Sequence, residues 1–235
     1  MYCIIDFMQE KEWDKEYKKS TFLTKESKPQ AAVLRFLKWL KKERDFELVD
    51  KKILDLGSGT GRNSNYIASL GNEVTGIEIS PTAIGLAQNR AHLDVQRLSK
   101  YIKQSIGEPY PFTDQSFDLA IDVTSSNSLN EKEREMYLKE THRVLKSNSY
   151  FFVRALSKDG DDNAKYLIKN NPGPEKDTYI MPETGIIERV FSREDFIATY
   201  SSRFTILHLE KETHYTRMTN RLYKRNFWIA YLKKK

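Results

Sequence analysis

The sequence has 235 residues, a formal net charge of +6, and 39% hydrophobic side chains. A chain of this length can bury one sizeable core, so we expect a single domain over residues 1–235. Its longest apolar runs fall far short of the roughly 18 residues that a membrane-spanning helix needs, and we therefore expect that the chain is not a membrane protein.

The ends of the chain carry the remaining compositional information. Residues 1–17 have no basic leader ahead of an apolar stretch, so we expect no secretion signal. Cys3 is the only cysteine, which excludes an internal disulfide and favours the reducing cytoplasm. Residues 201–235 hold nine basic and two acidic side chains. This basic segment could bind phosphates, or its lysines could simply deter edge pairing of a strand.

The first segment, residues 1–49, contains one clearly amphipathic stretch. Residues 29–48 place an apolar stripe on one helical face with lysines opposite. The stripe consists of Ala32, Val33, Phe36, Leu37 and Leu40. A membrane-surface helix could show this pattern, but we expect a helix packed on the flank of a sheet.

The second segment, residues 50–156, alternates strands with helices. The expected strands lie near 51–57, 72–80, 96–105, 116–125 and 149–156, and the helices between them near 62–71, 81–94 and 131–146. Such alternation predicts an α/β fold with a doubly wound, mainly parallel sheet and helices on both faces.

The last two segments differ from this core. Residues 157–191 contain three turn-rich breaks and read as an insertion on the substrate side. Residues 192–235 predict a helix followed by an antiparallel hairpin, with strands near 203–212 and 226–233 joined by a long loop over 213–225. These strands complete a seven-stranded sheet whose last strand is antiparallel.

The stretch "ILDLGSGTGRN" places Gly57, Gly59 and Gly61 directly after the first core strand. Glycines there let the chain turn sharply into a helix and let the backbone approach a ligand closely, which favours a nucleotide-like ligand. A dinucleotide-binding turn uses the spacing G-x-G-x-x-G, but Arg62 stands where its third small residue belongs. Starting at Gly59 instead puts Ser64 there, an imperfect match.

With Asp55 ahead of it, this turn resembles the first motif of class I S-adenosylmethionine-dependent methyltransferases, and specifically the small-molecule group that includes ubiquinone and menaquinone methyltransferases. Glu78 lies 17 residues after Gly61, where the family places an acid that accepts hydrogen bonds from the ribose hydroxyls. "GEPYPFTDQSFDLAI" and "ETHRVLKSNSYFFV" are similar to the family's approaches to strands four and five.

The resemblance implies S-adenosylmethionine as the cofactor and a set of residues around it. That set is Asp55, Gly57, Ser58, Gly59, Thr60, Gly61, Asn63, Glu78, Ile79, Ser105, Ile106 and Asp122. The sequence departs from the family at Ser105, where an acidic residue is usual near the adenine amine. It departs again at residues 147–149, which replace the usual Pro-Gly-Gly.

Methyl transfer from a sulfonium is an in-line displacement with an activated leaving group, so alignment supplies much of the acceleration and a base is dispensable. Catalytic candidates therefore come from position, at the carboxyl ends of the strands. They are Asp122, Thr124, Asn127 and His214. The loop after strand four lacks the Asn-Pro-Pro-aromatic sequence that similar amino-group methyltransferases of nucleic acid and protein amides carry.

The acceptor is expected to be a small, anionic molecule methylated on oxygen or nitrogen. Similar small-molecule methyltransferases fold an N-terminal segment over the cofactor, so Trp13 and Tyr17 suggest a lid, although core packing is an equal alternative. Tyr215, Arg217 and Arg221 are the expected substrate anchors. RNA held by a basic rim, or a non-catalytic cofactor-binding protein, are the alternatives. We expect no metal, because "DGDDN" at 159–163 fails as a calcium loop and reads as a turn that caps a helix; a magnesium site of these acids with Asp122 is the alternative.

Overall fold

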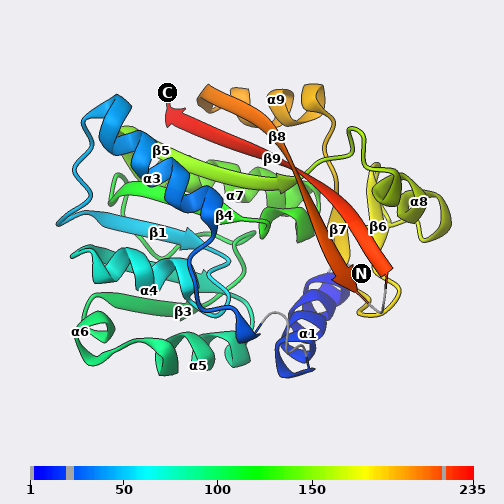
Figure 1. The fold of residues 1–235 in the computed structure, drawn as a ribbon, viewed down its shortest axis with the longest axis horizontal. Coiled ribbons are helices and arrows are strands. Elements are labelled where there is room, and N and C mark those ends of the chain that lie inside the picture. The colour runs from blue at the N-terminus through cyan, green and yellow to red at the C-terminus, as the bar shows by residue number, and fades with distance from the viewer. Residues whose placement is uncertain (1–2, 20–23, 219–220) are drawn as a thin grey trace.

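The computed structural model describes residues 3–19, 24–218 and 221–235, and the side chains of 9–19, 24–215 and 224–235. Its centre is a seven-stranded sheet in the order β3-β2-β1-β4-β5-β9-β8 (Figure 1). The strands are β1 (Lys52–Leu56), β2 (Glu73–Glu78), β3 (Ser99–Lys103), β4 (Phe117–Val123), β5 (Leu145–Leu156), β8 (Phe204–Met218) and β9 (Arg221–Lys234). The first five pair in parallel, and β9 is antiparallel to both of its neighbours, which confirms the predicted fold class.

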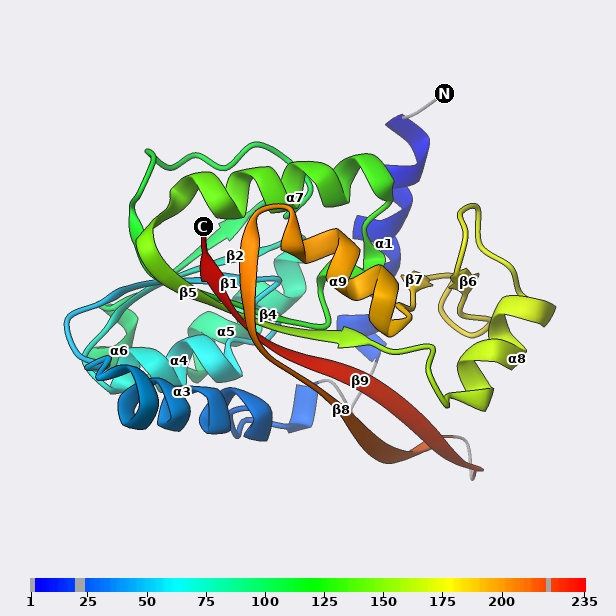
Figure 2. The same ribbon diagram turned by 90° about the horizontal axis from the view of Figure 1, so that it is seen from above.

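Helices cover both faces of this sheet. They are α1 (Cys3–Lys19), α3 (Ala31–Arg44), α4 (Arg62–Ser69), α5 (Pro81–Arg90), α6 (Leu93–Gln96), α7 (Glu131–Val144), α8 (Asp162–Asn170) and α9 (Arg193–Ser201). Figure 2 shows α7 and α9 on one face and α3 and α4 on the other. Parallel strands are apolar on both sides, so each face needs such a cover.

Helix α3 packs on the sheet, as its apolar stripe predicts. The five residues of the stripe are buried. The ring of Phe36 lies 5.2 Å from that of Phe152 on β5 and 4.9 Å from that of Tyr231 on β9. These contacts rule out the membrane-surface interpretation of α3. In the described part of the chain, no helix is both long and apolar enough to cross a bilayer.

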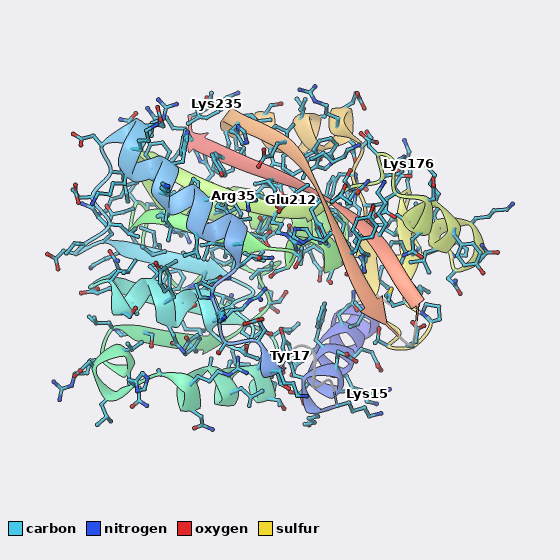
Figure 3. The ribbon with its side chains drawn as sticks, in the orientation of Figure 1. Lys15, Tyr17, Arg35, Lys176, Glu212 and Lys235 are labelled. Atoms are coloured by element: carbon cyan, nitrogen blue, oxygen red, sulfur yellow. The ribbon has the colours of Figure 1, made fainter. Side chains whose placement is uncertain are left out.

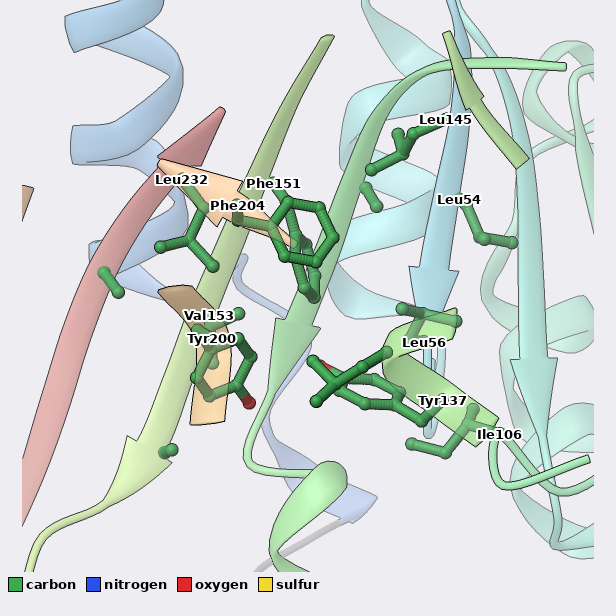
Figure 4. Close-up of a cluster of buried hydrophobic side chains, with 14 of the residues drawn as sticks. Leu54, Leu56, Ile106, Tyr137, Leu145, Phe151, Val153, Tyr200, Phe204 and Leu232 are labelled. Atoms are coloured by element: carbon green, nitrogen blue, oxygen red, sulfur yellow. The ribbon is translucent and has the colours of Figure 1, made fainter. Parts of the chain in front are cut away.

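The opposite face holds an aromatic core under α7 and α9 (Figure 4). The rings of Phe151 and Phe204 lie 5.4 Å apart, and Tyr200 packs beside them. Tyr137 is fully buried, and its hydroxyl donates a hydrogen bond of 2.7 Å to Asp122 at the end of β4. A buried tyrosine hydroxyl needs such a partner, so the core fixes the Asp122 carboxylate.

The C-terminal hairpin is longer than the sequence predicts. Strands β8 and β9 pair from Phe204 with Lys234 to Met218 with Arg221, with one register shift between Ile206 and His208, so the prediction of a long loop over 213–225 is wrong. Strand pairing satisfies backbone groups whatever the side chains are. The polar, basic residues of 213–225 lack the apolar alternation that marks a half-buried strand, which hides the pairing.

The insertion over 157–191 contains α8 and a two-stranded sheet of β6 (Thr178–Ile180) and β7 (Ile187–Arg189). Asp161 caps α8 by accepting a hydrogen bond of 2.9 Å from the N–H of Ala164. Its other oxygen accepts one of 2.8 Å from the N–H of Asn226 on β9. The acidic turn therefore joins the insertion to the hairpin beside the carboxyl end of β5.

Candidate active site

The glycine turn between β1 and α4 has a backbone that only glycine adopts easily. Gly57, Gly59 and Gly61 have φ angles of 68°, 53° and 73°, in the left-handed region. A Cβ at Gly57 would collide with the side chain of Ser125, and one at Gly59 would lie 2.8 Å from the hydroxyl of Tyr17. The turn therefore needs glycines because its backbone is left-handed and because neighbouring side chains leave no space for a Cβ.

Glu78, at the end of β2, faces the turn. Its Oε2 accepts a hydrogen bond of 2.8 Å from the N–H of Gly59, and its Oε1 accepts one of 2.9 Å from the N–H of Ser80. Burial raises the pKa of Glu78, and these backbone hydrogen bonds oppose the rise. Each carboxylate oxygen keeps a further lone pair, so the side chain can still accept hydrogen bonds from two hydroxyl groups.

A cavity of about 1570 Å³ opens in front of this turn. Nine of the twelve residues that the resemblance implies for cofactor binding line it: Gly57, Ser58, Gly59, Thr60, Asn63, Glu78, Ile79, Ser105 and Ile106. The cavity then continues past the ends of β4 and β5 to α8 and the hairpin. We call these two parts the turn half and the hairpin half.

The other three residues of that set, Asp55, Gly61 and Asp122, do not line the cavity. Asp55 accepts a hydrogen bond of 2.5 Å from the hydroxyl of Ser64, and burial, with the nearby charges of Asp122 and Glu78, raises its pKa to about 7. Asp122 accepts from the N–H groups of Ser125 and Ser126 as well as from Tyr137, and burial raises its pKa too. Both carboxyls therefore lie behind the cavity wall, where Asp55 binds α4 and Asp122 binds the loop after β4.

Helix α1 covers the turn half. Trp13 and Tyr17 line the cavity, and burial, reinforced by the charge of Glu78, raises the pKa of Tyr17. Asp14 docks the helix, because its carboxylate accepts hydrogen bonds of 2.8 Å from the hydroxyl of Ser80 and 3.0 Å from the N–H of Thr82. Burial favours the neutral acid, but hydrogen bonds from Lys18, Thr82 and Ser80 hold the pKa of Asp14 well below its usual value.

The far end of α1 reaches the insertion. The Gln9 amide donates to the carbonyl of Ile187 at 3.1 Å and accepts from its N–H at 3.3 Å. Glu10 pairs with Lys103 at 2.6 Å. In Figure 3, Tyr17 lies on the side of α1 that faces the body of the molecule. One helix thus bridges the end of β3, the start of α5 and strand β7.

The hairpin half carries several charged groups on an apolar wall. Its lining includes Arg154, Leu156, Leu167, Glu188, His214, Arg225 and Phe227. Glu188 accepts from Tyr179 at 2.8 Å and pairs with Arg225 at 3.1 Å. Burial opposes the charge of Arg225, but Glu188 outweighs it and raises the pKa of this guanidinium.

His214 lies in this half, beside an ion pair between α3 and β8. Arg35 and Glu212 are 2.8 Å apart and adjacent in Figure 3. The other oxygen of Glu212 is 2.9 Å from Nε2 of His214. Among the other catalytic candidates, Thr124 lines the cavity, whereas Asn127 does not. The Asn127 side chain instead accepts from the N–H of Leu156 at 3.1 Å and so holds β5 against the loop after β4.

Of the three expected anchors on the hairpin, the structure describes the side chain of Tyr215 alone, and it lies away from the cavity. Tyr215 is 64% exposed and does not line it, because neighbouring side chains on a strand point to opposite faces and His214 takes the inner one. The side chains of Arg217 and Arg221 fall outside the described residues.

Sequence reasoning missed two cavity arginines. Arg62 begins α4, and Arg154 stands in the otherwise apolar strand "YFFVRAL". A charged residue inside a buried strand is rarely left without a function or a partner, and that exception was visible in the sequence.

Comparisons with known proteins agree with this geometry. A family model described as a methyltransferase domain matches residues 54–153. An uncharacterised methyltransferase of Schizosaccharomyces pombe is 30% identical over 107 residues, which cover 46% of this chain and 72% of that protein. The crystal structure of a SAM-dependent methyltransferase from Methanosarcina mazei superposes with a TM-score of 0.70 and 26% identity, over 82% of this chain and 96% of that one. This chain belongs to the class I S-adenosylmethionine-dependent methyltransferases.

The cofactor of this methyltransferase fold is S-adenosylmethionine. The chain spans less than half the length of several other curated relatives that it matches. One is a demethylmenaquinone methyltransferase of Tropheryma whipplei, 32% identical over 103 residues, which cover 44% of this chain and 41% of that protein. The family model ends at residue 153, so α8 and the hairpin, which line much of the hairpin half, lie outside it.

Proposed function

We propose that the chain transfers a methyl group from S-adenosylmethionine to an oxygen or nitrogen of a small, anionic acceptor. The observation that carries this proposal is the continuity of the cavity, which runs from Glu78 and the glycine turn to His214 and Arg225 on the hairpin. A cofactor in the turn half and an acceptor in the hairpin half would meet beside the loop after β4.

The residues of the turn half fit the cofactor. Gly57 and Gly59 line the cavity with backbone alone, which would let its methionine and ribose approach closely, and Glu78 has lone pairs left for two ribose hydroxyls. Ile106 lines the cavity as an apolar surface for the adenine ring, with Ser105 as a polar neighbour. Trp13 and Tyr17 of α1 close this half from above and exclude water.

The bound cofactor supplies a methyl group on a positively charged sulfur, whose departure needs no acid. The task of the chain is therefore to hold the acceptor atom in line with that bond. Thr124 and His214 are the candidates that reach the cavity and could orient the acceptor or take its proton. Asp122 and Asn127 act as positioning residues, through the loop that carries Thr124.

The positive C-terminal segment gives the RNA alternative little support within the described residues. Arg203 pairs with Glu135, and the ammonium groups of Lys234 and Lys235 donate to the carbonyls of Leu145 and Ser201. These groups lie at the amino end of β5 and the base of the hairpin, away from the cavity. A cavity that is lined by α1, α8 and the hairpin suits a small molecule better than a nucleic-acid strand.

Methyl-labelled S-adenosylmethionine tests the proposal directly. The purified chain is incubated with labelled cofactor and either a small-metabolite pool or total RNA. We expect label in small molecules, a strong loss with Glu78→Ala, and full transfer with Arg203→Gln. Label in RNA alone would contradict the proposal, and cofactor binding without transfer to any fraction would support a non-catalytic binding protein.

The same assay examines the hairpin anchors expected from sequence. Arg217→Ala and Arg221→Ala should each lower transfer if these side chains hold the acceptor. Unchanged transfer in both variants would remove them from the site.

A further inference from the structure

Arg154 is a buried cation without a carboxylate partner among the described residues. Its side chain is 7% exposed, lines the hairpin half, and makes no ion pair with any described residue. Its Nε is fully buried and has no hydrogen-bond partner. Burial lowers the pKa of this guanidinium to about 9, so it still carries its charge at neutral pH. A buried charge without a counter-ion is costly, which makes its retention in the wall of a cavity informative.

The acids near Arg154 are already engaged. Glu212 is shared between Arg35 and His214, and Glu188 between Arg225 and Tyr179. Glu212 favours the charge of Arg154, while the charges of Arg62, Arg225 and Arg35 oppose it. Because the nearby acid is already paired with other groups, an anion entering the cavity would be stabilised at this side chain.

Phe227 holds the Arg154 guanidinium in place. The Cζ of Arg154 lies 3.4 Å from the centre of the Phe227 ring, a cation–π contact that occupies one face of the group. The edge of a guanidinium carries the N–H donors, and its fork matches the two oxygens of a carboxylate or phosphate. A stacked and oriented fork is already arranged to bind an oxyanion.

The position of Arg154 connects this site to the cofactor. Its carbonyl accepts a hydrogen bond of 2.7 Å from the N–H of Thr124, and the hydroxyl of the next residue, Ser125, donates to the carbonyl of Gly57 at 3.1 Å. Residues Thr124 and Ser125, in the loop after β4, thus contact both the backbone of Arg154 and the glycine turn. An acceptor held at Arg154 would lie next to the cofactor.

We infer that Arg154 binds the carboxylate or phosphate of the methyl acceptor, and that the acceptor joins this oxyanion to an apolar body packed on Leu156, Leu167 and Phe227. This inference rests on the proposed function, since it assigns an anchor within the same cavity. It replaces the expected anchor Tyr215, which faces solvent on β8, with a buried side chain of β5.

Calorimetry with simple probes tests the inference. Phenyl phosphate, benzoate and the neutral benzyl alcohol are titrated into the chain saturated with S-adenosylhomocysteine, the demethylated cofactor. We expect at least one of the two anions to bind and the alcohol to bind much more weakly. Arg154→Met keeps an unbranched apolar stem but removes the guanidinium, and should weaken anion binding by about tenfold or more. Arg154→Lys should retain part of it, and the control Arg203→Gln all of it.

The outcomes separate the inference from the proposed function. Failure of S-adenosylhomocysteine to bind the wild-type chain would contradict the proposed function, and the probes would then be titrated alone. Intact cofactor binding with anion binding that ignores Arg154, or with no anion binding at all, would contradict the inference only. A loss of cofactor affinity in Arg154→Met without a change in anion binding would assign Arg154 to the carboxylate of the cofactor and overturn the inference as well.

If both Arg154 variants fail to fold, the wild-type chain still gives an answer. The Nε–H resonances of its arginine side chains are followed by NMR while phenyl phosphate is added. The inference requires that the resonances of cavity arginines shift with the probe and stay still with benzyl alcohol. An unchanged arginine spectrum at saturating probe would overturn it.

Discussion

Glu78 and Gly59 are joined by a hydrogen bond of 2.8 Å from the backbone N–H to the carboxylate, so the acid that ends β2 also holds the middle of the glycine turn. The same carboxylate keeps lone pairs toward the cavity. One side chain therefore fixes the shape of the turn and offers acceptors to the ligand that the turn admits.

Replacing Glu78 tests this double role. Glu78→Ala should weaken S-adenosylmethionine binding by about 1–3 kcal/mol, because two ribose hydroxyls lose their acceptor in a buried site. Calorimetry gives the difference. Glu73→Ala, at the exposed start of the same strand, is the matched control and should bind as the wild type does. Equal affinity in both variants would remove Glu78 from the cofactor site.

Two glycine substitutions compare a strained turn with an ordinary helix. Gly57→Ala should destabilise the fold by about 1–3 kcal/mol, since φ is 68° and the new methyl group meets Ser125. Gly85→Ala, within α5 and with open space at its Cβ, should stabilise it by about 0.5–1 kcal/mol. Urea unfolding measures both, and a neutral Gly57→Ala would show that the turn tolerates a side chain.

The raised pKa of Asp55 should make the free energy of unfolding depend on pH. Its pKa is raised to about 7 by burial. A carboxyl whose pKa rises on folding favours the folded state at low pH, and this contribution is lost as the pH rises from the unfolded value of about 4 through 7. The free energy of unfolding of the wild type should therefore fall, relative to that of Asp55→Asn, between pH 4.5 and 8.

Urea unfolding at several pH values measures this difference. Asp94→Asn, which removes an exposed carboxyl from α6, serves as the control and should follow the wild-type profile. Parallel profiles for the wild type and Asp55→Asn would show that Asp55 titrates no differently in the folded state.

Docking of α1 should control cofactor exchange. Asp14→Ala removes the acceptor of the hydrogen bonds from Ser80 and Thr82, so the helix should open more often and S-adenosylhomocysteine should dissociate faster. Stopped-flow fluorescence can follow this, because Trp13 lines the cavity. Lys11→Ala, on the exposed side of the same helix, should keep the wild-type rate. If Asp14→Ala also leaves the rate unchanged, α1 is not a lid.

Much of the fold is readable from local pattern. The stripe from Ala32 to Leu40 identifies α3 and its buried face, and the glycine turn with Asp55 and Glu78 identifies the cofactor core. These features depend on neighbours within one helix or one turn, so periodicity and spacing reveal them. The Ser80 cap of α5 is equally local, since its hydroxyl accepts from the N–H of Ala83 three residues later.

The remainder depends on contacts between distant segments. Residues 213–218 and 221–225 form strands because each segment supplies the other's hydrogen bonds, and their largely polar side chains give no periodic pattern. Which side of a strand faces the cavity follows from the register of the whole sheet, so Tyr215 was expected at the site and Arg154 was not. The docking of α1 through Asp14 likewise becomes visible only when helix and sheet are placed together.

Calorimetric titration of the wild-type chain with S-adenosylmethionine, and separately with NAD, tests the central claim most directly, because both ligands suit a glycine turn at the end of a β-strand. The account predicts binding of S-adenosylmethionine with one site per chain, lost in large part in Glu78→Ala, and no comparable binding of NAD. Tight binding of NAD without binding of S-adenosylmethionine would contradict it.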